Sequence, residues 1–360
     1  MKQAPARHLS SMESTSFIAS LLRASAGGFA ALAVNRTLER SGEAGELDGS
    51  FDAWRAQFQD LVLELASAVA DGSQGQFASK VGWVRDALMS RGLQIDFLRS
   101  GLEELGAVLE ESLPDNTWPP LSGFMAAASQ ELDRTSSPDD VRGADHEPLG
   151  EIASAYLAHI LEGDGAGAID LVVSAIQDNQ LSVPDALEEV LTPVLREVGH
   201  LWHEGVLNVA EEHFASQTAG RNLELIVQMA PKPPAFGRTV VLTMVEGDAH
   251  DIGLRIVAAF FELDGWRTIC LGANTPAIDL ALSAQSFDAD LVVIGATLNT
   301  QRADVVRALE VLKKARPDQK ILIGGNAFSE LEGRADEFGA SVCALVPRDA
   351  VRLGRGLFRA

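Results

Sequence analysis

The sequence predicts an α plus α/β protein in three parts: an all-helical N-terminal domain, a four-helix bundle and a C-terminal doubly wound parallel sheet. Three observations lead to this prediction. Apolar residues recur at helical spacing through most of the first 235 residues of the 360-residue chain. A short polar segment, RTSSPDDVRGADHEP, interrupts that pattern. After residue 236, short apolar runs alternate with helical segments.

Composition excludes several classes of protein. Apolar residues make up 46% of the chain and charged residues 22%, which argues against disorder. Acidic residues number 51 against 29 basic ones, and the net charge of -22 disfavours direct nucleic-acid binding. The two cysteines, Cys270 and Cys343, lie in apolar runs that read as buried strands. With no apolar run of about 18 residues and no signal-peptide core, we expect a cytoplasmic protein without disulfides or membrane contact.

Residues 1–133 are predicted to form an all-helical domain of five or six helices. Apolar side chains recur at three- and four-residue steps over residues 51–65 and 81–109. Gly92 interrupts the second stretch and would end a helix there. Residues 41–49 are polar and predict a flexible tip between helices.

Residues 134–148 read as a polar interdomain linker and residues 149–235 as a four-helix bundle. One helix of the bundle should carry its apolar residues on a single face and end at Gly205. Those apolar residues are Leu187, Val190, Leu191, Val194, Leu195, Val198, Leu201 and Trp202. Asn208 and Glu211 have the spacing of a capping box, which predicts that the next helix begins there.

Residues 236–360 are predicted to form the doubly wound parallel sheet. Four short apolar runs should be strands buried on both faces, with helices between them. The runs begin at Val240, Thr268, Leu291 and Ile321, and a weaker fifth lies near Val342. Because ligands of such sheets bind at the carboxyl ends of the strands, the loops after these runs are the expected place for a site.

The loop after the first predicted strand carries the strongest chemical signal. Asp248, His250 and Gly253 follow one another there at spacings of two and three residues. A metal-ligating histidine commonly gives its second ring nitrogen to a carboxylate, and a glycine lets a bulky planar ligand approach the backbone. The alternative interpretation is a loop histidine that follows an aspartate by chance. A Rossmann dinucleotide site is excluded, because no G-x-G-x-x-G follows this strand.

The Asp248-x-His250-x-x-Gly253 pattern resembles the D-x-H-x-x-G signature of cobalamin-binding domains, whose fold is flavodoxin- or Rossmann-like. The resemblance implies that the cofactor is bound base-off, with His250 as the lower axial cobalt ligand. Gly324 and Gly325, which end the fourth run, look like the glycine pair that lines the slot for the cofactor's nucleotide tail.

One element departs from that family's pattern. Many members carry S-x-L after the third strand, where this chain has Ala296-Thr297-Leu298. The serine hydroxyl is therefore missing, and with it one hydrogen bond to the tail or to the ligand network. Thr297, which precedes Leu298, is the residue whose hydroxyl could replace that of the missing serine.

A second group of candidate residues lies in the predicted bundle. Trp202 and His203 stand at the end of one predicted helix, and nine residues separate Trp202 from Glu212-His213 in the first turns of the next. Taken singly, such residues are more often core packing or a solvated surface. Together they resemble the Trp-nine-residue-Glu-His motif of light-sensing adenosylcobalamin proteins of the CarH and LitR type, within the stretch LWHEGVLNVAEEHFAS.

That resemblance implies a role for each of these residues. Trp202 would pack over the upper corrin face against the adenosyl group, and Glu212 and His213 would complete the pocket around the ribose and adenine. His203 matches the histidine that takes the upper cobalt position after the adenosyl group is lost by photolysis. Moving that histidine would shift the bundle and change its self-association.

The N-terminal part departs from CarH. CarH-type proteins begin with a MerR-type winged-helix DNA-binding domain, which residues 1–133 do not resemble. An all-helical, globin-like sensor domain before a cobalamin module is similar to the photocobilins, which add biliverdin. No cysteine precedes the predicted sheet, so a bilin would be held non-covalently. Lys80, Arg85 and Arg91 are candidate propionate partners and Trp83 a stacking surface, although ordinary helix roles are the plainer interpretation of each.

These resemblances imply a cytoplasmic, non-enzymatic, light-sensing adenosylcobalamin protein, with biliverdin as a potential second chromophore. Its partners would be further copies of itself, in a light-dependent manner, and a downstream regulatory protein or enzyme, but neither nucleic acid nor membrane. Two alternatives stay open. One is a corrinoid methyl carrier, which also joins a helical bundle to a D-x-H-x-x-G domain. The other is an antirepressor that binds a transcription factor and uses cobalamin as a structural support.

Overall fold

The computed structural model describes residues 11–40, 50–114, 117–134, 148–331, 335–344 and 346–358. They form two compact units: residues 1–146 with 203–205, and residues 147–202 with 206–360. The predicted tip at 41–49 and most of the predicted linker at 134–148 lie outside the described residues.

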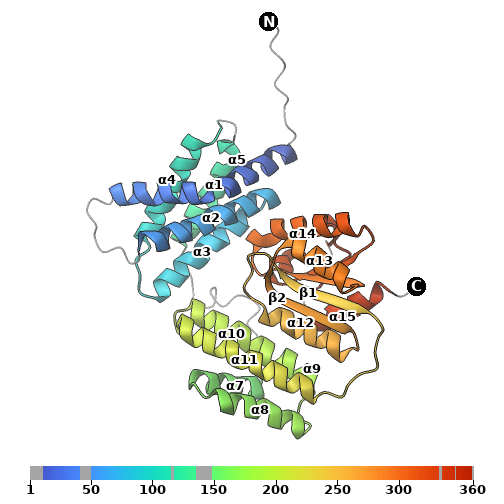
Figure 1. Cartoon of the computed structure of the whole chain (residues 1–360). Coiled ribbons are helices and arrows are strands. Elements are labelled where there is room, and N and C mark those ends of the chain that lie inside the picture. Colours follow the sequence, from blue (N-terminus) through green and yellow to red (C-terminus); the bar gives the residue numbers. More distant parts are fainter. Residues whose placement is uncertain are drawn as a thin grey trace. The chain divides into compact units, whose positions relative to one another are not determined.

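The N-terminal unit is helical, as predicted (Figure 1). Its helices are α1 (Ser11–Arg40), α2 (Phe51–Asp71), α3 (Gln74–Ser90), α4 (Asp96–Ser112) and α5 (Trp118–Asp133). The side-chain hydroxyls of Ser50 and Ser73 accept backbone N–H groups in the first turns of α2 and α3 and so cap these helices. All five helices contribute to one core, in which Phe58, Phe77 and Leu105 are fully buried.

Helix α1 contains a longer apolar segment than expected. Its residues Thr15–Arg40 are long and apolar enough to cross a membrane by length and composition. The expectation that no apolar run reaches such a length is therefore wrong. In the structure, however, Ile18, Leu22 and Ala30 of α1 are fully buried in the core of the unit. The apolar character of the helix is thus used, at least in part, for packing within the domain.

The close contact of α2 with α4 makes a sharp test of this core. A Cβ added at Gly101 would overlap the fully buried ring of Phe58. Gly101→Ala should therefore destabilise the protein by about 1–3 kcal/mol. At Gly28 of α1 an added Cβ meets nothing within 4 Å, so Gly28→Ala should stabilise it by about 0.5–1 kcal/mol. Urea unfolding of both variants measures the difference, and equal stabilities would contradict this packing.

The bundle of the second unit comprises α7 (Glu151–Leu161), α8 (Gly165–Gln177), α9 (Val183–Asp185), a π-helical turn (Ala186–Leu191), α10 (Thr192–His203) and α11 (Val209–Met229). The single predicted helix with the apolar face, which starts at Leu187, is thus two consecutive segments, the π-helical turn and α10. The carbonyl of Leu187 accepts bonds from both the N–H and the side-chain hydroxyl of Thr192, which stabilises the wider turn. The predicted capping box of Asn208 and Glu211 is confirmed at the start of α11.

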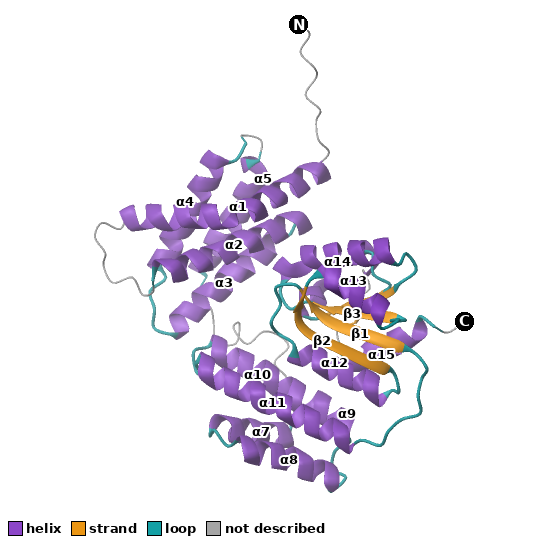
Figure 2. Cartoon of the chain, viewed as in Figure 1, coloured by secondary structure: helices purple, strands orange, loops and turns teal. Residues whose placement is uncertain are grey.

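The remaining residues form a five-stranded parallel sheet in the order β2-β1-β3-β4-β5. Figure 2 labels the neighbouring strands β1, β2 and β3 of this sheet. The strands are β1 (Thr239–Val245), β2 (Arg267–Thr275), β3 (Leu291–Gly295), β4 (Lys320–Gly324) and β5 (Val342–Ala344). The helices are α12 (Ile252–Leu263), α13 (Ala277–Ser286), α14 (Arg302–Ala315) and α15 (Pro347–Gly356). The predicted fold class is confirmed.

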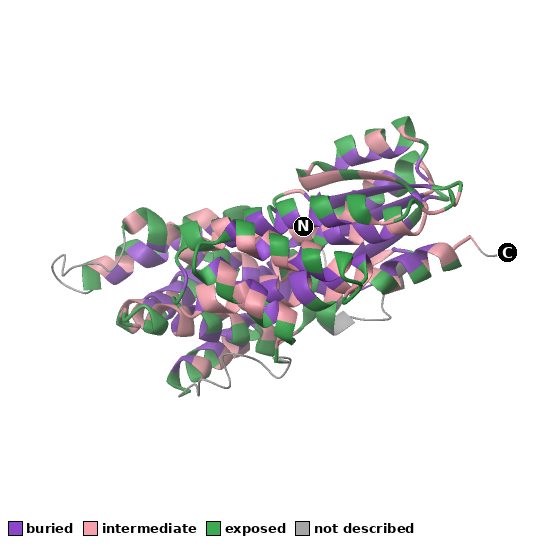
Figure 3. Cartoon of the chain, turned by 90° about the horizontal axis from the view of Figure 1, so that it is seen from below, coloured by how far each residue is buried: buried purple, intermediate pink, exposed green. Residues whose placement is uncertain are grey.

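Side chains of β1 alternate between two cores, as a strand covered on both faces requires. Val240 and Leu242 belong to a core that includes α12, α15 and the bundle, whereas Val241 belongs to a core with α13 and α14. Strands β1 and β3 are buried along their whole length. Figure 3 shows how buried and exposed residues alternate along the helices. Strand β2 lies at the sheet edge and is only partly covered, so the prediction that Cys270 is buried is wrong: it is exposed.

Candidate functional site

The predicted metal-ligand loop lies at the carboxyl end of β1, between that strand and α12. Asp248 is fully buried, whereas 66% of the His250 side chain is exposed. Oδ1 of Asp248 accepts two hydrogen bonds from His250, one from the backbone N–H at 3.0 Å and one from ring Nδ1 at 2.9 Å. The second contact occupies Nδ1, so Nε2 of the exposed imidazole is the ring nitrogen that could bind a metal.

Electrostatics couple the two side chains. The hydrogen bond to Asp248 is the main cause that raises the pKa of His250; burial opposes it and the charges of Asp248 and Glu212 add to it. Burial alone would raise the pKa of Asp248, but the bonds from His250 and Thr297 outweigh it and hold that pKa below its usual range. Asp248 is therefore a carboxylate at neutral pH and a strong acceptor for the Nδ1 proton.

The loop after β3 binds the second carboxylate oxygen of Asp248. The backbone N–H of Thr297 donates to Oδ2 of Asp248 at 2.7 Å and to Oε1 of Gln301 at 3.0 Å. Gln301 also accepts the N–H of Leu298, and its side chain is buried. Thr297 thus reaches the ligand network, in part through its backbone. Gln301 was missed in the sequence; its place four residues after Thr297, in the loop after a buried strand, is the signal that could have found it.

The three predicted glycine positions differ in why they require glycine. An added Cβ at Gly253 would meet nothing within 4 Å, so the backbone there is open to a ligand. Gly325 has φ 97°, and an added Cβ would overlap the carbonyl oxygen of Ala296; one at Gly324 would overlap that of Ala344. The pair at the end of β4 is therefore required by close packing of backbones as well as by any ligand.

The bundle brings Glu212 towards the loop. Glu212 is close enough for its charge to raise the pKa of His250, and its Oε1 accepts the hydroxyl of Ser216 at 2.6 Å. The His213 ring is 71% exposed, with Nε2 at 3.7 Å from Oε2 of Glu212. Trp202 is partly buried against the core shared by the bundle, α12 and α15. Of these bundle residues, Glu212 is the one whose charge reaches the imidazole of His250.

His203 is placed differently from its neighbour Trp202. It belongs with the N-terminal unit, where its ring stacks on Trp83 at 4.3 Å between centroids and is 6% exposed. Its carbonyl oxygen accepts bonds from Oγ of Ser90 at 3.2 Å and from Arg91 at 3.1 Å. To act as a cobalt ligand, the His203 ring must first leave the Trp83 ring.

The candidate bilin partners have other contacts. Arg85 is buried and binds Asp86 and the carbonyls of Glu131 and Arg134, so it is not accessible to a propionate, contrary to expectation. The ammonium of Lys80 lies 4.2 Å from the centroid of the Trp83 ring, and burial lowers its pKa.

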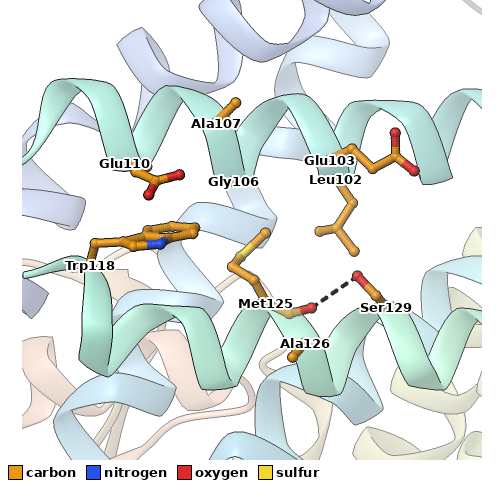
Figure 4. A pocket seen from close by; sticks show the side chains of 9 residues that line it. All are labelled: Leu102, Glu103, Gly106, Ala107, Glu110, Trp118, Met125, Ala126 and Ser129. Atoms are coloured by element: carbon orange, nitrogen blue, oxygen red, sulfur yellow. Dashed lines mark hydrogen bonds between the residues drawn. The ribbon is translucent and has the colours of Figure 1, made fainter.

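A pocket of about 380 Å³ opens between α4 and α5 (Figure 4). It is lined by Leu102, Glu103, Gly106, Ala107, Glu110, Trp118, Met125, Ala126 and Ser129. Its charged lining residues are Glu103, which pairs with Arg40 at 3.3 Å, and Glu110, and the lining offers no basic side chain to a bilin propionate.

The donor set fits a corrin better than a bare metal ion. Among the described residues, no group of three or more His, Cys, Asp or Glu side chains could hold a metal ion. A corrin supplies its own equatorial nitrogens, so the protein needs only one axial donor. His250 offers that donor with its second nitrogen held by a buried carboxylate, which is the usual arrangement of a metal-ligating histidine.

Comparison with known proteins identifies relatives of the bundle and of the sheet. Residues 238–352 and residues 152–226 match two families, each described as a B12 binding domain. A corrinoid protein of Desulfitobacterium hafniense is 31% identical over 200 residues, 54% of this chain and 91% of its own length. A dimethylamine corrinoid protein of Methanosarcina acetivorans is 27% identical over 203 residues, 53% of this chain and 94% of its own.

A third relative and a solved structure extend the comparison. The transcriptional repressor CarH of Myxococcus xanthus is 32% identical over 143 residues, 39% of this chain and 47% of its own length. The solved monomethylamine corrinoid protein of Methanosarcina barkeri has the same fold, with a TM-score of 0.51 at 21% identity, over 58% of this chain and 99% of its own. The bundle, the sheet and the His250 loop thus have counterparts of known class, and the chain belongs to the family of cobalamin-binding corrinoid proteins.

Proposed function

We propose that this protein is a light-sensing adenosylcobalamin regulator that has no enzymatic activity of its own and changes its self-association or partner binding on illumination. The observation that carries the proposal is the arrangement of the bundle residues: Trp202 lies near the end of α10, and the capping box at Asn208 places Glu212 and His213 in the first turns of α11. The Glu212 carboxylate suits an adenosyl group, whose ribose and adenine offer hydrogen-bond donors, better than a bare methyl group. The relative CarH, a transcriptional repressor, supports a regulatory role.

Each residue then has a distinct task. His250 holds the cofactor from below, with its ring oriented by Asp248. Trp202 and Glu212 form the upper pocket, and His213 adds an exposed polar group at its edge. Bound adenosylcobalamin supplies a cobalt–carbon bond that visible light breaks. With that bond broken, His203 would be the residue that moves, and its movement would displace the end of α10.

A corrinoid methyl carrier is the second candidate. It is supported by the corrinoid relatives, two of which match over 91% and 94% of their lengths, against 47% for CarH. In that case the upper pocket would serve a methyl group passed between partner enzymes. Preference for the adenosyl over the methyl form of the cofactor distinguishes the two candidates, because only the first needs Glu212 for binding.

The light response is tested on the full chain loaded with adenosylcobalamin in the dark. We expect the molar mass or elution volume, measured by size exclusion with light scattering, to change after green light. Protein loaded with light-stable cyanocobalamin should not change. Glu212→Gln should weaken binding of the adenosyl form, whereas Glu211→Gln keeps the capping box intact and serves as the matched control.

The outcomes separate the alternatives. Identical dark and lit profiles for the wild type would contradict the light response. Equal affinity for adenosyl- and methylcobalamin, unaffected by Glu212→Gln, would favour the carrier. Partner binding that depends on cobalamin but not on light would favour the antirepressor.

A second chromophore is tested by titration with biliverdin. A red-shifted absorption band would support a biliverdin site in the N-terminal unit, and absence of the band would contradict such a site.

A further inference from the structure

The end of strand β2 also binds the loop that carries His250. Asn274 lies next to the last residue of β2 and has φ 52°, in the left-handed region. Its side-chain Oδ1 accepts a hydrogen bond from the N–H of Gly247 at 2.7 Å. Its own backbone N–H donates to the carbonyl oxygen of Asp248 at 2.9 Å. One residue therefore binds both ends of the Gly247–Asp248 segment.

These contacts complete the fixation of Asp248. Its carbonyl oxygen is held by Asn274, and its Oδ2 by the N–H of Thr297. The remaining carboxylate oxygen, Oδ1, meets the backbone N–H and the ring Nδ1 of His250. With the main chain and one oxygen of Asp248 anchored by two different strand ends, the direction of Oδ1 is set, and with it the direction of the imidazole.

The residue type at position 274 suits this task. Glycine and asparagine are the residues that adopt a left-handed backbone most readily, but only asparagine also offers a side-chain acceptor. Gly247 is itself left-handed, with φ 85°, and is exposed. Without the carboxamide of Asn274, the N–H of Gly247 would be satisfied by water, which cannot fix the position of the loop.

We propose that Asn274 is a positioning residue for the cobalt ligand: its carboxamide and its backbone N–H hold the Gly247–Asp248 segment so that Asp248 presents His250 to the metal. The proposal rests on His250 as the axial ligand and is independent of the light response. Asn274 does not itself contact the metal in this account. It acts through Asp248, in the same way that Thr297 does from β3.

The test is the fraction of cobalt that carries a histidine nitrogen. Full-length protein labelled with ¹⁵N-histidine is loaded with natural-abundance cobalamin, reduced to the cobalt(II) state and examined by electron paramagnetic resonance, in which a twofold splitting marks cobalt bound by histidine. Asn274→Gly keeps the left-handed backbone and removes the acceptor. Since one neutral hydrogen bond corresponds to about a fivefold change in an equilibrium, the ratio of ligated to unligated cobalt should fall about fivefold. Asn274→Asp keeps an acceptor and should restore the wild-type ratio.

The chain offers a matched control. Asn179 is also left-handed, with φ 57°, and is exposed at the end of α8, away from the loop. Asn179→Gly makes the same chemical change and should leave the ratio unaltered. An Asn274→Gly spectrum equal to that of the wild type would overturn the proposal, as would an equal loss in Asn179→Gly. A wild-type spectrum without the twofold splitting would overturn the assignment of His250, and this proposal with it.

A measurement on the wild type alone guards against a variant that does not fold. The N–H of Gly247 belongs to an exposed residue, yet it donates to Asn274. Amide hydrogen exchange of the apoprotein should therefore be slow at Gly247 and fast at the exposed neighbour Ala249. Equal, fast exchange at both positions would show that the contact does not persist, and would contradict the proposal.

Discussion

Replacing His250 with alanine is expected to reduce cobalamin affinity at least about 100-fold, because loss of residues that merely orient a metal ligand already costs about 10–100-fold. The apoprotein should lose about 1 kcal/mol of stability, because the ring, which is 66% exposed, contributes little to packing but donates one hydrogen bond to the buried Asp248. Titration with adenosylcobalamin, together with urea unfolding of the apoprotein, measures both effects.

The second histidine–aspartate pair in the chain provides the control. Nδ1 of His159 lies 3.0 Å from Oδ2 of Asp164, near the start of α8. His159→Ala removes a similar pair that no part of the site uses, so affinity should be unchanged. If His250→Ala bound cobalamin as tightly as His159→Ala does, His250 would not be the axial ligand.

Replacing Asp248 with asparagine should affect both binding and stability. The change keeps the shape of a fully buried side chain but substitutes an amide for a carboxylate that accepts bonds from His250 and Thr297. We expect the affinity for cobalamin to fall about 10–100-fold. The free energy of unfolding should fall by about 1–3 kcal/mol, because the amide leaves hydrogen-bonding groups of the site without a partner. Asp164→Asn, in the pair with His159, is the matched control for the change of charge.

The same variant should alter the pH dependence of binding. A protonated imidazole cannot ligate cobalt, so affinity should fall as the pH falls through the pKa of His250. Asp248 raises that pKa above the usual value of about 6.5, so the midpoint should lie above that pH in the wild type. In Asp248→Asn the midpoint should move down. Identical midpoints in the two proteins would show that the pair does not control the ligand.

The stability that Asp248 contributes should also fall as the pH falls, but in a lower pH range than the affinity. Its pKa is lower in the folded chain than the unfolded value of about 3.9. The contribution is therefore fully present above that pH and is lost as the pH falls through the folded pKa. Between pH 6 and 8, roughly, Asp248 stays ionised and only His250 of the pair titrates. Affinity measurements in that range thus report on the histidine.

Local patterns in the sequence were enough to predict most of the fold. Buried strands are continuous apolar runs, and the runs at Val240, Leu291 and Ile321 became β1, β3 and β4. The capping box at Asn208 was visible because its partners are three residues apart. The Asp248–His250 contact was also predictable, since two residues of spacing in a tight loop bring a carboxylate to its ring.

The features that the sequence did not reveal depend on contacts between distant segments. Whether β2 lies at an edge is decided by strand order, which its own residues do not encode, and this is why Cys270 was misjudged. The π-helical turn before α10 has the same apolar spacing as an α-helix over a few residues. Gln301 and Asn274 lie in loops after other strands, and only the folded sheet brings them to Asp248 or its neighbours.

The most direct test of the account is the origin of the nitrogen on cobalt. Protein grown with ¹⁵N-histidine is loaded with natural-abundance cobalamin, reduced to cobalt(II) and examined by electron paramagnetic resonance. If the imidazole of His250 is the axial ligand, the threefold nitrogen splitting seen with unlabelled protein becomes twofold in the labelled protein, and His250→Ala abolishes it. A threefold splitting that survives labelling would mean that the nitrogen belongs to the cofactor's own base, and would contradict the central assignment.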